Sequence, residues 1–167
     1  MKRQKSTGPW YVYVERNKEK PDQVYTGSTN EPWRRARQHK GEISGGARTT
    51  RIWGKGNAEM VIVVGPFAGS LTEGRHFERL WKKNKIAGGM SGRIRTLCKL
   101  IGTHDGKVSH KLHLGAREDP VTVKTSLTRD QFMAFLLEDN PKGVLPTKYV
   151  DFHFEAVMPP PKPIPFK

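Results

Sequence analysis

Side chains with acid–base or charge chemistry recur at defined spacing in the first half of the chain. Tyr11 and Tyr25 each belong to a short extended run, Arg35 and His39 follow four residues apart, and Glu78 lies further along. A phenol, an imidazole or a carboxylate can carry a proton, whereas a guanidinium keeps a fixed positive charge. A helix would place Arg35 and His39 on one face. These residues therefore form a candidate site for chemistry on an anionic substrate.

The overall charge also indicates an anionic partner. The 167 residues carry 30 Lys and Arg against 16 Asp and Glu, a net charge of +14, of which +10 lies in residues 1–92. We expect a polyanion, with nucleic acid ahead of an anionic membrane. The sequence contains neither a run of about 18 apolar residues nor an N-terminal pattern typical of a secretory signal. Cys98 is the only cysteine, which excludes an intrachain disulfide and favours a reducing, intracellular compartment.

Hydrophobic periodicity predicts the elements that must position these residues. Alternating residues predict two strands joined as a hairpin, and a longer apolar run predicts a central strand. Asn30 can cap a helix with Pro32 in its first turn. Phe77, Leu80 and Trp81 are spaced for one face of a helix turned towards the sheet. The strands are expected at 10–15, 23–27 and 58–67, and the helices at 30–40 and 72–85.

A glycine-rich run at 88–92 is expected to act as a hinge, because glycines weaken regular structure. Beyond the hinge, we expect helices at 93–101 and 128–137, the second capped by Thr128, and strands near 111–114, 120–125 and 148–157. The expected divisions are a basic arm at 1–8, a first domain at 9–87, the hinge, an appended α+β region at 93–157 and a Pro-rich tail at 158–167.

Four motifs in this order resemble those of the GIY-YIG nuclease superfamily: WYVYV at 10–14, YTG at 25–27, RRARQH at 34–39 and FERLW at 77–81. Arg35 lies ten residues after Tyr25 and His39 four beyond it, as the family pattern requires. Within the superfamily, the sequence looks most like the catalytic subunit of the eukaryotic structure-selective endonuclease that cuts branched DNA. That likeness rests on GGARTTR at 45–51, AEMVIVV at 58–64 and HFERLWK at 76–82. The resemblance implies an α+β fold with a small central β-sheet flanked by helices, here with a small appended α+β region.

The resemblance implies metal-dependent hydrolysis of a DNA phosphodiester bond, with a single Mg²⁺ or Mn²⁺. Glu78 would be the metal ligand, since Mg²⁺ prefers hard oxygen and often takes one protein carboxylate beside water and phosphate. Arg35 would bind the phosphate as negative charge builds up. Tyr25 would be the general base, Tyr11 would orient water or phosphate, and His39 would relay the proton or bind the phosphate.

Basic residues around this set are expected to contact the DNA backbone. They are Arg34, Arg37, Lys40, Arg48, Arg51, Lys55, Lys82, Lys83 and Lys85. The site residues also have structural interpretations: Glu78 can pair with Lys82 on its helix, and His39 can lie on the helix surface or at its end. Tyr13 is assigned to packing within its strand.

The predicted function is structure-selective cleavage of four-way junctions, flaps or forks. A sequence-specific restriction or homing-type endonuclease of the same superfamily and a non-catalytic nucleic-acid-binding protein are the alternatives. The first motif reads Pro9-Trp10-Tyr11 instead of Gly-Ile-Tyr, and the second has Thr26 at its centre, but both keep the tyrosine. The resemblance also implies a Cys-rich zinc domain that docks a scaffold partner. Cys98 alone cannot build this domain, so the sequence does not decide whether a scaffold partner binds. A homodimer is possible. The protein is expected in the nucleus or another DNA-containing compartment, and a cellular and a viral origin both stay open.

Overall fold

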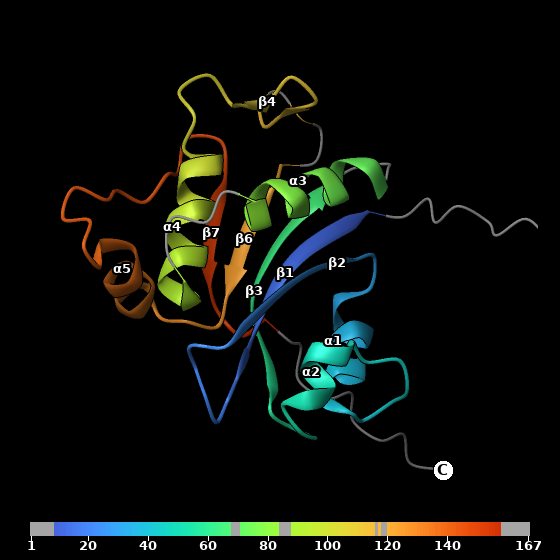
Figure 1. The fold of residues 1–167 in the computed structure, drawn as a ribbon. Helices are drawn as coiled ribbons and strands as arrows, with labels where there is room; N and C mark the ends of the chain where they lie inside the picture. Colours follow the sequence, from blue (N-terminus) through green and yellow to red (C-terminus); the bar gives the residue numbers. More distant parts are fainter. Residues whose placement is uncertain (1–8, 68–70, 84–87, 116, 118–119, 158–167) are drawn as a thin grey trace, which may run out of the picture.

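The computed structural model describes residues 9–67, 71–83, 88–115, 117 and 120–157. At its centre is a five-stranded sheet in the order β2-β1-β3-β6-β7 (Figure 1). Neighbouring strands are antiparallel, except that β6 and β7 run parallel. The strands are β1 Trp10–Asn17, β2 Val24–Thr29, β3 Ala58–Phe67, β6 Thr122–Thr125 and β7 Asp151–Phe154. The predicted hairpin and the predicted central strand are both confirmed.

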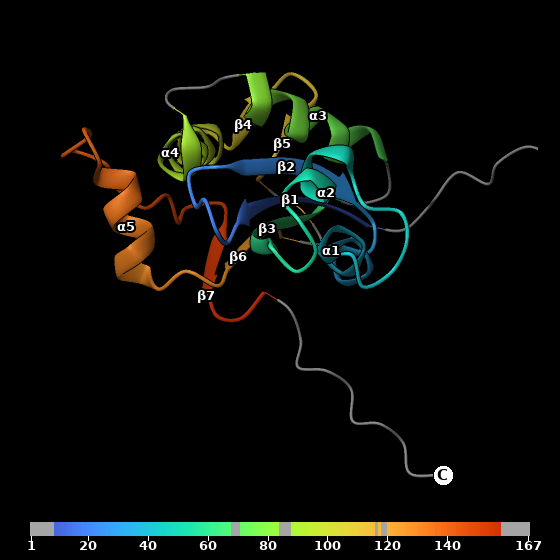
Figure 2. The same cartoon turned by 60° about the horizontal axis from the view of Figure 1, so that its bottom comes forward.

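Helices cover the two faces of this sheet, with α3 and α4 on one side and α1 on the other, next to α2 (Figures 1 and 2). The helices are α1 Pro32–Lys40, α2 Arg48–Ile52, α3 Leu71–Lys83, α4 Gly89–Ile101 and α5 Arg129–Leu137. The α+β fold with a central sheet flanked by helices is thus confirmed. Among the described residues, none of the helices combines the length and the apolar character needed to cross a membrane.

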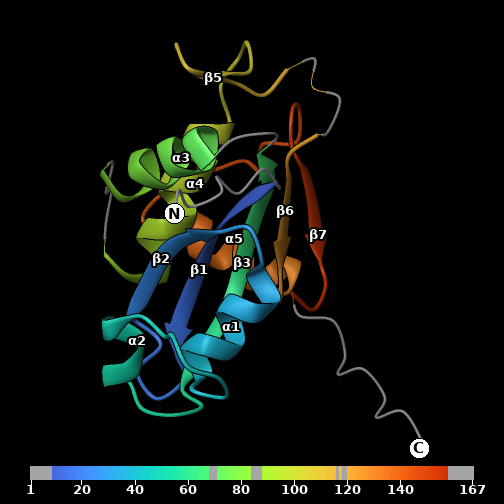
Figure 3. The same cartoon turned by 90° about the vertical axis from the view of Figure 1, so that its right-hand side faces the viewer.

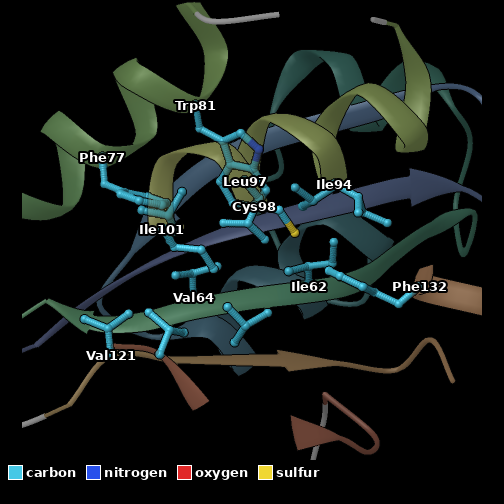
Figure 4. Packing of buried hydrophobic residues seen from close by; sticks show 14 of the residues in the cluster. Ile62, Val64, Phe77, Trp81, Ile94, Leu97, Cys98, Ile101, Val121 and Phe132 are labelled. Atoms are coloured by element: carbon cyan, nitrogen blue, oxygen red, sulfur yellow. The ribbon is translucent and has the colours of Figure 1, made fainter. Parts of the chain in front are cut away.

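The alternation of residues along β1 divides the interior into two layers. Val12 and Val14 point to the side of α3 and α4 and join a large apolar cluster. Tyr13, between them in sequence, points to the other side and packs with Ala36 of α1 and Met60 of β3. Figure 4 shows the large cluster, in which α3 and α4 contribute Phe77, Trp81, Ile94, Leu97, Cys98 and Ile101. The expected face of α3 is therefore confirmed for Phe77 and Trp81, which are fully buried.

The appended region shares the sheet and the core of the first part. Its strands β6 and β7 extend the sheet beyond β3, and Phe132 of α5 belongs to the large cluster. Thr128 caps α5 as predicted: its hydroxyl accepts a hydrogen bond from the Gln131 N–H at 3.1 Å, and the Gln131 side chain accepts from the Thr128 N–H at 2.9 Å. These bonds satisfy two polar groups at the start of the helix.

The expected hinge at 88–92 differs from the structure. Gly88 is the N-cap of α4, and Gly89 to Gly92 form the first turn of that helix. Each glycine costs a helix about 1 kcal/mol relative to alanine. Burial of Met90 and Ile94 against the sheet offsets this cost. Tertiary packing therefore outweighs the tendency of these glycines to interrupt the helix, which was the basis for predicting a hinge.

Three further details differ from the sequence-based expectations. The N-cap of α1 is Glu31 and not Asn30, and the Thr29 hydroxyl accepts a hydrogen bond from the Glu31 N–H at 3.0 Å. A separate two-stranded hairpin forms from β4 Lys107–Ser109 and β5 Leu112–His113 (Figure 3). The last strand is shorter than expected. The arm at 1–8 and the tail at 158–167 lie outside the described residues.

Trp81 should be a major contributor to stability. Its side chain is fully buried, and its Nε1–H donates to the Arg93 carbonyl at 2.8 Å, which joins α3 to α4. We expect Trp81→Ala to lower the free energy of unfolding by about 3–5 kcal/mol in urea titrations, because it leaves a cavity and removes the hydrogen bond that joins α3 to α4. Ile52→Ala, at a residue that is 75% exposed, should change it by less than about 0.5 kcal/mol. Equal effects would contradict this account of the core.

Candidate active site

The register of the β1–β2 hairpin places the candidate tyrosines on one face of the sheet. Tyr11 pairs with Thr29, Tyr13 with Gly27 and Glu15 with Tyr25. Paired residues of antiparallel strands share a face, so Tyr11, Tyr13, Glu15 and Tyr25 all lie on the side covered by α1. Tyr11 and Tyr25 therefore share a face of the sheet, but the Tyr13–Gly27 pair separates them.

Tyr13 and not Tyr11 reaches across β2. A Cβ atom on Gly27 would lie 2.5 Å from the Tyr13 hydroxyl and 3.1 Å from Cε1 of Tyr25. The missing side chain of Gly27 thus makes room for the Tyr13 ring. Tyr11 lies against the opposite neighbour, since a Cβ on Gly65 of β3 would lie 2.6 Å from its Cδ1. Tyr13, which sequence reasoning assigned to packing, therefore places its hydroxyl in the candidate site.

Arg35 holds its guanidinium at this hydroxyl. Its Nε donates to the Tyr13 oxygen at 3.4 Å, and its Nη1 donates to Gln38 Oε1 at 3.0 Å and to the Gly45 carbonyl at 2.9 Å. These bonds fix the plane of the charged group. Burial raises the pKa of Tyr13, and the bond from Arg35 opposes that shift only in part. The Tyr13 phenol therefore stays protonated at neutral pH.

His39 and Glu15 form a buried pair behind the tyrosines. His39 Nδ1 lies 2.8 Å from Glu15 Oε2, and both side chains are almost fully buried. The rings of Tyr13 and Tyr25 contact the imidazole edge-on, with centroids 5.8 and 5.4 Å from it. His39 Nε2 has no hydrogen-bond partner among the described residues. His39 is thus an interior residue of the site, and the structural interpretation as a helix-surface residue is wrong.

Glu15 is a site residue that sequence reasoning missed. Burial raises the pKa of its carboxyl group, and the hydrogen bond from His39 offsets part of the shift. The available signal was its place in the strand: Glu15 follows Tyr11 and Tyr13 at a spacing of two, on the same face. A carboxylate at an inward position of an otherwise apolar strand requires a buried partner.

Glu78 approaches from the other face of the sheet, on α3. It lines a cavity of about 600 Å³ together with Ser28 of β2 and four basic residues of α3, Arg75, Arg79, Lys82 and Lys83. Its Oε2 lies 3.0 Å from Lys82 Nζ, so the predicted alternative pairing with Lys82 is present in the structure. Lys82 Nζ also lies 5.8 Å from the centroid of the Tyr25 ring. Lys82 therefore connects Glu78 with the tyrosine cluster.

The two halves of the site meet at the outer strand β2. Ser28 lines the cavity of Glu78 and also a second cavity of about 280 Å³ that contains Arg34, Arg35 and Gln38. Because β2 is the last strand of the sheet, groups on opposite faces can both approach its free edge. Arg35 and Glu78 thus border two neighbouring cavities, one on each face of the sheet, and do not contact each other directly.

The chemistry of Glu78 fits a divalent cation. Its carboxylate is 21% exposed and opens to a cavity large enough for water and a phosphate oxygen. The described residues contain no group of three or more His, Cys, Asp or Glu that could hold a metal. A site of one carboxylate completed by water and substrate oxygen suits Mg²⁺, which keeps several water ligands. The cation would replace Lys82 as the counter-charge of Glu78.

The remaining predicted basic residues form two groups, and one of these groups lines the cavities. Arg34, Lys82 and Lys83 line one cavity or the other. The others lie on α1, α2 and the turn after α2, and Arg37 pairs with Glu42 at 3.4 Å. These are Arg37, Lys40, Arg48, Arg51 and Lys55. Lys85 lies outside the described residues.

Comparison with known proteins gives this arrangement a family. Residues 9–90 match the family model described as the GIY-YIG catalytic domain. These residues belong to the GIY-YIG family. The match includes the β1–β2 hairpin, α1 and α3, and therefore every candidate catalytic residue that the sequence indicates.

Two relatives of the GIY-YIG domain are named as endonuclease subunits. "Structure-specific endonuclease subunit SLX1 homolog" of Giardia intestinalis is 41% identical over 71 residues, which cover 42% of this chain and 19% of that protein. "Structure-specific endonuclease subunit slx1" of Aspergillus niger is 37% identical over 75 residues, 45% of this chain and 18% of that protein. The predicted likeness to a structure-selective endonuclease subunit is thus confirmed for the GIY-YIG domain. The matching segment spans less than a fifth of these relatives.

Glu15 should give stability a pH dependence that a glutamine lacks. Because its pKa is raised above the usual 4.5, the native state keeps a proton that the unfolded chain has lost. The free energy of unfolding should therefore fall as the pH rises above about 4.5 towards the native-state pKa. We expect Glu15→Gln to remove this slope in thermal unfolding between about pH 4 and pH 8. The exposed Glu155→Gln should keep the wild-type slope, and a slope retained by Glu15→Gln would contradict the assignment.

Proposed function

We propose that this protein is a divalent-metal-dependent DNA endonuclease that hydrolyses phosphodiester bonds in branched DNA. The observation that carries the proposal is that Arg35 and Glu78 border two cavities that share Ser28, at the free edge of β2. The names of the two relatives support cleavage selected by DNA structure. Four basic residues line the Glu78 cavity, which suits a phosphate backbone.

Arg35 supplies the fixed positive charge for the scissile phosphate. Its guanidinium is held by Gln38 and Gly45 through Nη1, which leaves Nη2 for a phosphate oxygen. A group held in place before the reaction stabilises the charge of the transition state without a reorganisation cost. Lysine would be a poor substitute, because it lacks the planar set of donors.

Tyr25 is the proposed base for the attacking water. Tyr13 is unsuited, because burial keeps its phenol protonated, whereas Tyr25 is partly exposed and lies beside Lys82. His39 lies against the Tyr25 ring, and Glu15 holds its Nδ1. The unpartnered Nε2 is the atom at which His39 would accept a proton.

Glu78 would hold the divalent cation, with Mg²⁺ or Mn²⁺ as candidates. When bound, the cation polarises the scissile phosphate and stabilises the leaving oxygen. Ser28 lines the same cavity and offers a hydroxyl to the phosphate or to a water ligand. Lys82 would then be released from Glu78 to contact the DNA backbone.

The assembly and location of the protein are also proposals. The word "subunit" in the relatives' names supports a partner protein, and a second copy of this chain would supply the second active site that symmetric cutting of a junction requires. A DNA substrate would support a location in an intracellular compartment that holds DNA, such as the nucleus.

Removal of the Glu78 carboxylate should separate cleavage from binding. We expect Glu78→Gln to lower the cleavage rate of labelled four-way junctions, flaps and forks by at least about 100-fold in Mg²⁺ or Mn²⁺, with little loss of DNA affinity. Glu155→Gln, at the residue after β7, is the matched control and should cleave normally. Wild-type protein that cuts no DNA would refute the enzyme proposal and favour a binding protein. Cutting of one sequence in linear duplex would favour a restriction or homing-type enzyme.

The two tyrosines of β1 should differ in their effect on cleavage. Tyr13→Phe removes the hydroxyl that accepts from Arg35 Nε, so we expect a rate about 10-fold lower, the equivalent of about 1.4 kcal/mol. Tyr11→Phe should have the smaller effect, because the Tyr11 ring lies against Gly65 on the other side. Single-turnover rates measure the difference. A larger effect at Tyr11 would restore the assignment made from the sequence.

A further inference from the structure

The β4–β5 hairpin lies outside the five-stranded sheet, beyond α3 (Figures 1 and 3). Its root is part of the folded body, because Leu112 and Leu114 are buried in the large apolar cluster. The exposed positions are polar: Lys107, His110, Lys111 and His113 all point to solvent. The hairpin is therefore a fixed projection with a polar surface.

Two side-chain contacts attach this hairpin to α3, the helix that carries Glu78. Arg117 follows the hairpin, and its Nη1 donates to the His113 carbonyl of β5 at 3.0 Å. It also binds Glu73 through both guanidinium nitrogens, Nη1 to Oε1 at 3.0 Å and Nη2 to Oε2 at 2.8 Å. His76 Nε2 lies 2.7 Å from the Ser109 hydroxyl. A two-point ion pair that is largely shielded from solvent fixes both distance and orientation. The hairpin is thus held in a fixed position relative to the candidate active site.

The hairpin carries an excess of positive charge. From His104 to Leu114 its acidic residue is Asp105, whose Oδ1 accepts a hydrogen bond from the Lys107 N–H at 3.0 Å. That hydrogen bond is the largest cause of the lowered pKa of Asp105, so this carboxylate is used to stabilise the turn. Glu118 and Asp119, which follow in the sequence, lie outside the described residues. Lys107 of β4 and Lys111 of the turn between the two strands are exposed, and neither has an acidic partner among the described ion pairs.

This basic surface continues into the Glu78 cavity. Burial lowers the pKa of His76, and the positive charges of Lys111, Arg79 and His110 lower it further. Arg79 also lines the Glu78 cavity, together with Arg75. Positive charge therefore runs along α3 from the cavity to the tip of the hairpin.

We propose that the β4–β5 hairpin is a second nucleic-acid contact surface, which binds the phosphate backbone of a duplex arm leaving the cleavage site. The inference deepens the proposed function, since the substrate of that site supplies the arm. An anionic membrane fits less well, because the exposed positions of the hairpin include no apolar side chain for insertion. Continuity with the Glu78 cavity favours a phosphodiester chain over an acidic protein.

The salt dependence of DNA binding tests this surface directly. We expect the full chain with Glu78→Gln to bind DNA without cutting it, so Kd can be measured by fluorescence anisotropy between about 50 and 200 mM salt. In this background, Lys107→Gln with Lys111→Gln should weaken binding to a four-way junction. The slope of log Kd against log salt should fall by about 1.8, since each lost phosphate contact contributes about 0.9.

A matched pair of lysines elsewhere provides the control. Lys18→Gln with Lys142→Gln removes the same charge from exposed positions in the β1–β2 turn and after α5, and its slope should stay close to that of Glu78→Gln alone. Junctions with arms of different length add a second measurement, because the hairpin substitutions should have no effect once the arm is too short to reach the hairpin.

Equal slopes for the two lysine pairs would overturn the proposal. It would also be overturned if the hairpin substitutions reduced binding to vesicles of anionic phospholipid and left DNA binding unchanged. Cleavage by the wild-type protein is a separate measurement: its absence, with the hairpin effect on binding intact, would refute the endonuclease proposal and leave the second contact surface standing.

Discussion

The outer position of β2 is the constraint on which the candidate site depends. α1 and α3 cover opposite faces of the sheet, and in its interior a layer of hydrogen-bonded backbone would keep their side chains apart. At the last strand this separation ends, so Arg35 from one face and Glu78 from the other both border cavities lined by Ser28. Strand order thus creates the site, and neither helix could do so alone.

One face of β1 packs in the apolar core, and the other face carries residues of the candidate site. Val12 and Val14 join the large apolar cluster, which supplies most of the buried hydrocarbon. Tyr13 and Glu15 face the other way and form a polar layer with His39. A buried pair of ionisable groups contributes little net stability, yet it fixes the orientation of the groups it joins. The apolar face therefore stabilises a strand whose other face is arranged for function.

Sequence reasoning predicted what local patterns determine. The hairpin, the central strand and the Thr128 cap follow from alternation and capping chemistry, and spacing alone placed Arg35 and His39 on one face. It failed where long-range packing decides. The first turn of α4 is helical despite its glycines, and the Tyr13 ring occupies the space above Gly27 only because of the strand register. Glu15 was missed because its partner His39 is distant in the sequence and adjacent only after folding.

Strand β6 has a consequence for how the GIY-YIG domain exists as a folded unit. It pairs with β3 from Ile62 to Gly65, so the longest and most apolar strand of the sheet has neighbours on both sides. A chain cut at Gly88, the N-cap of α4, would expose that side of β3 as a long hydrophobic edge, the kind of surface that recruits other strands into aggregates. The segment after the family motifs therefore acts as a built-in cover that protects this edge from pairing with other chains.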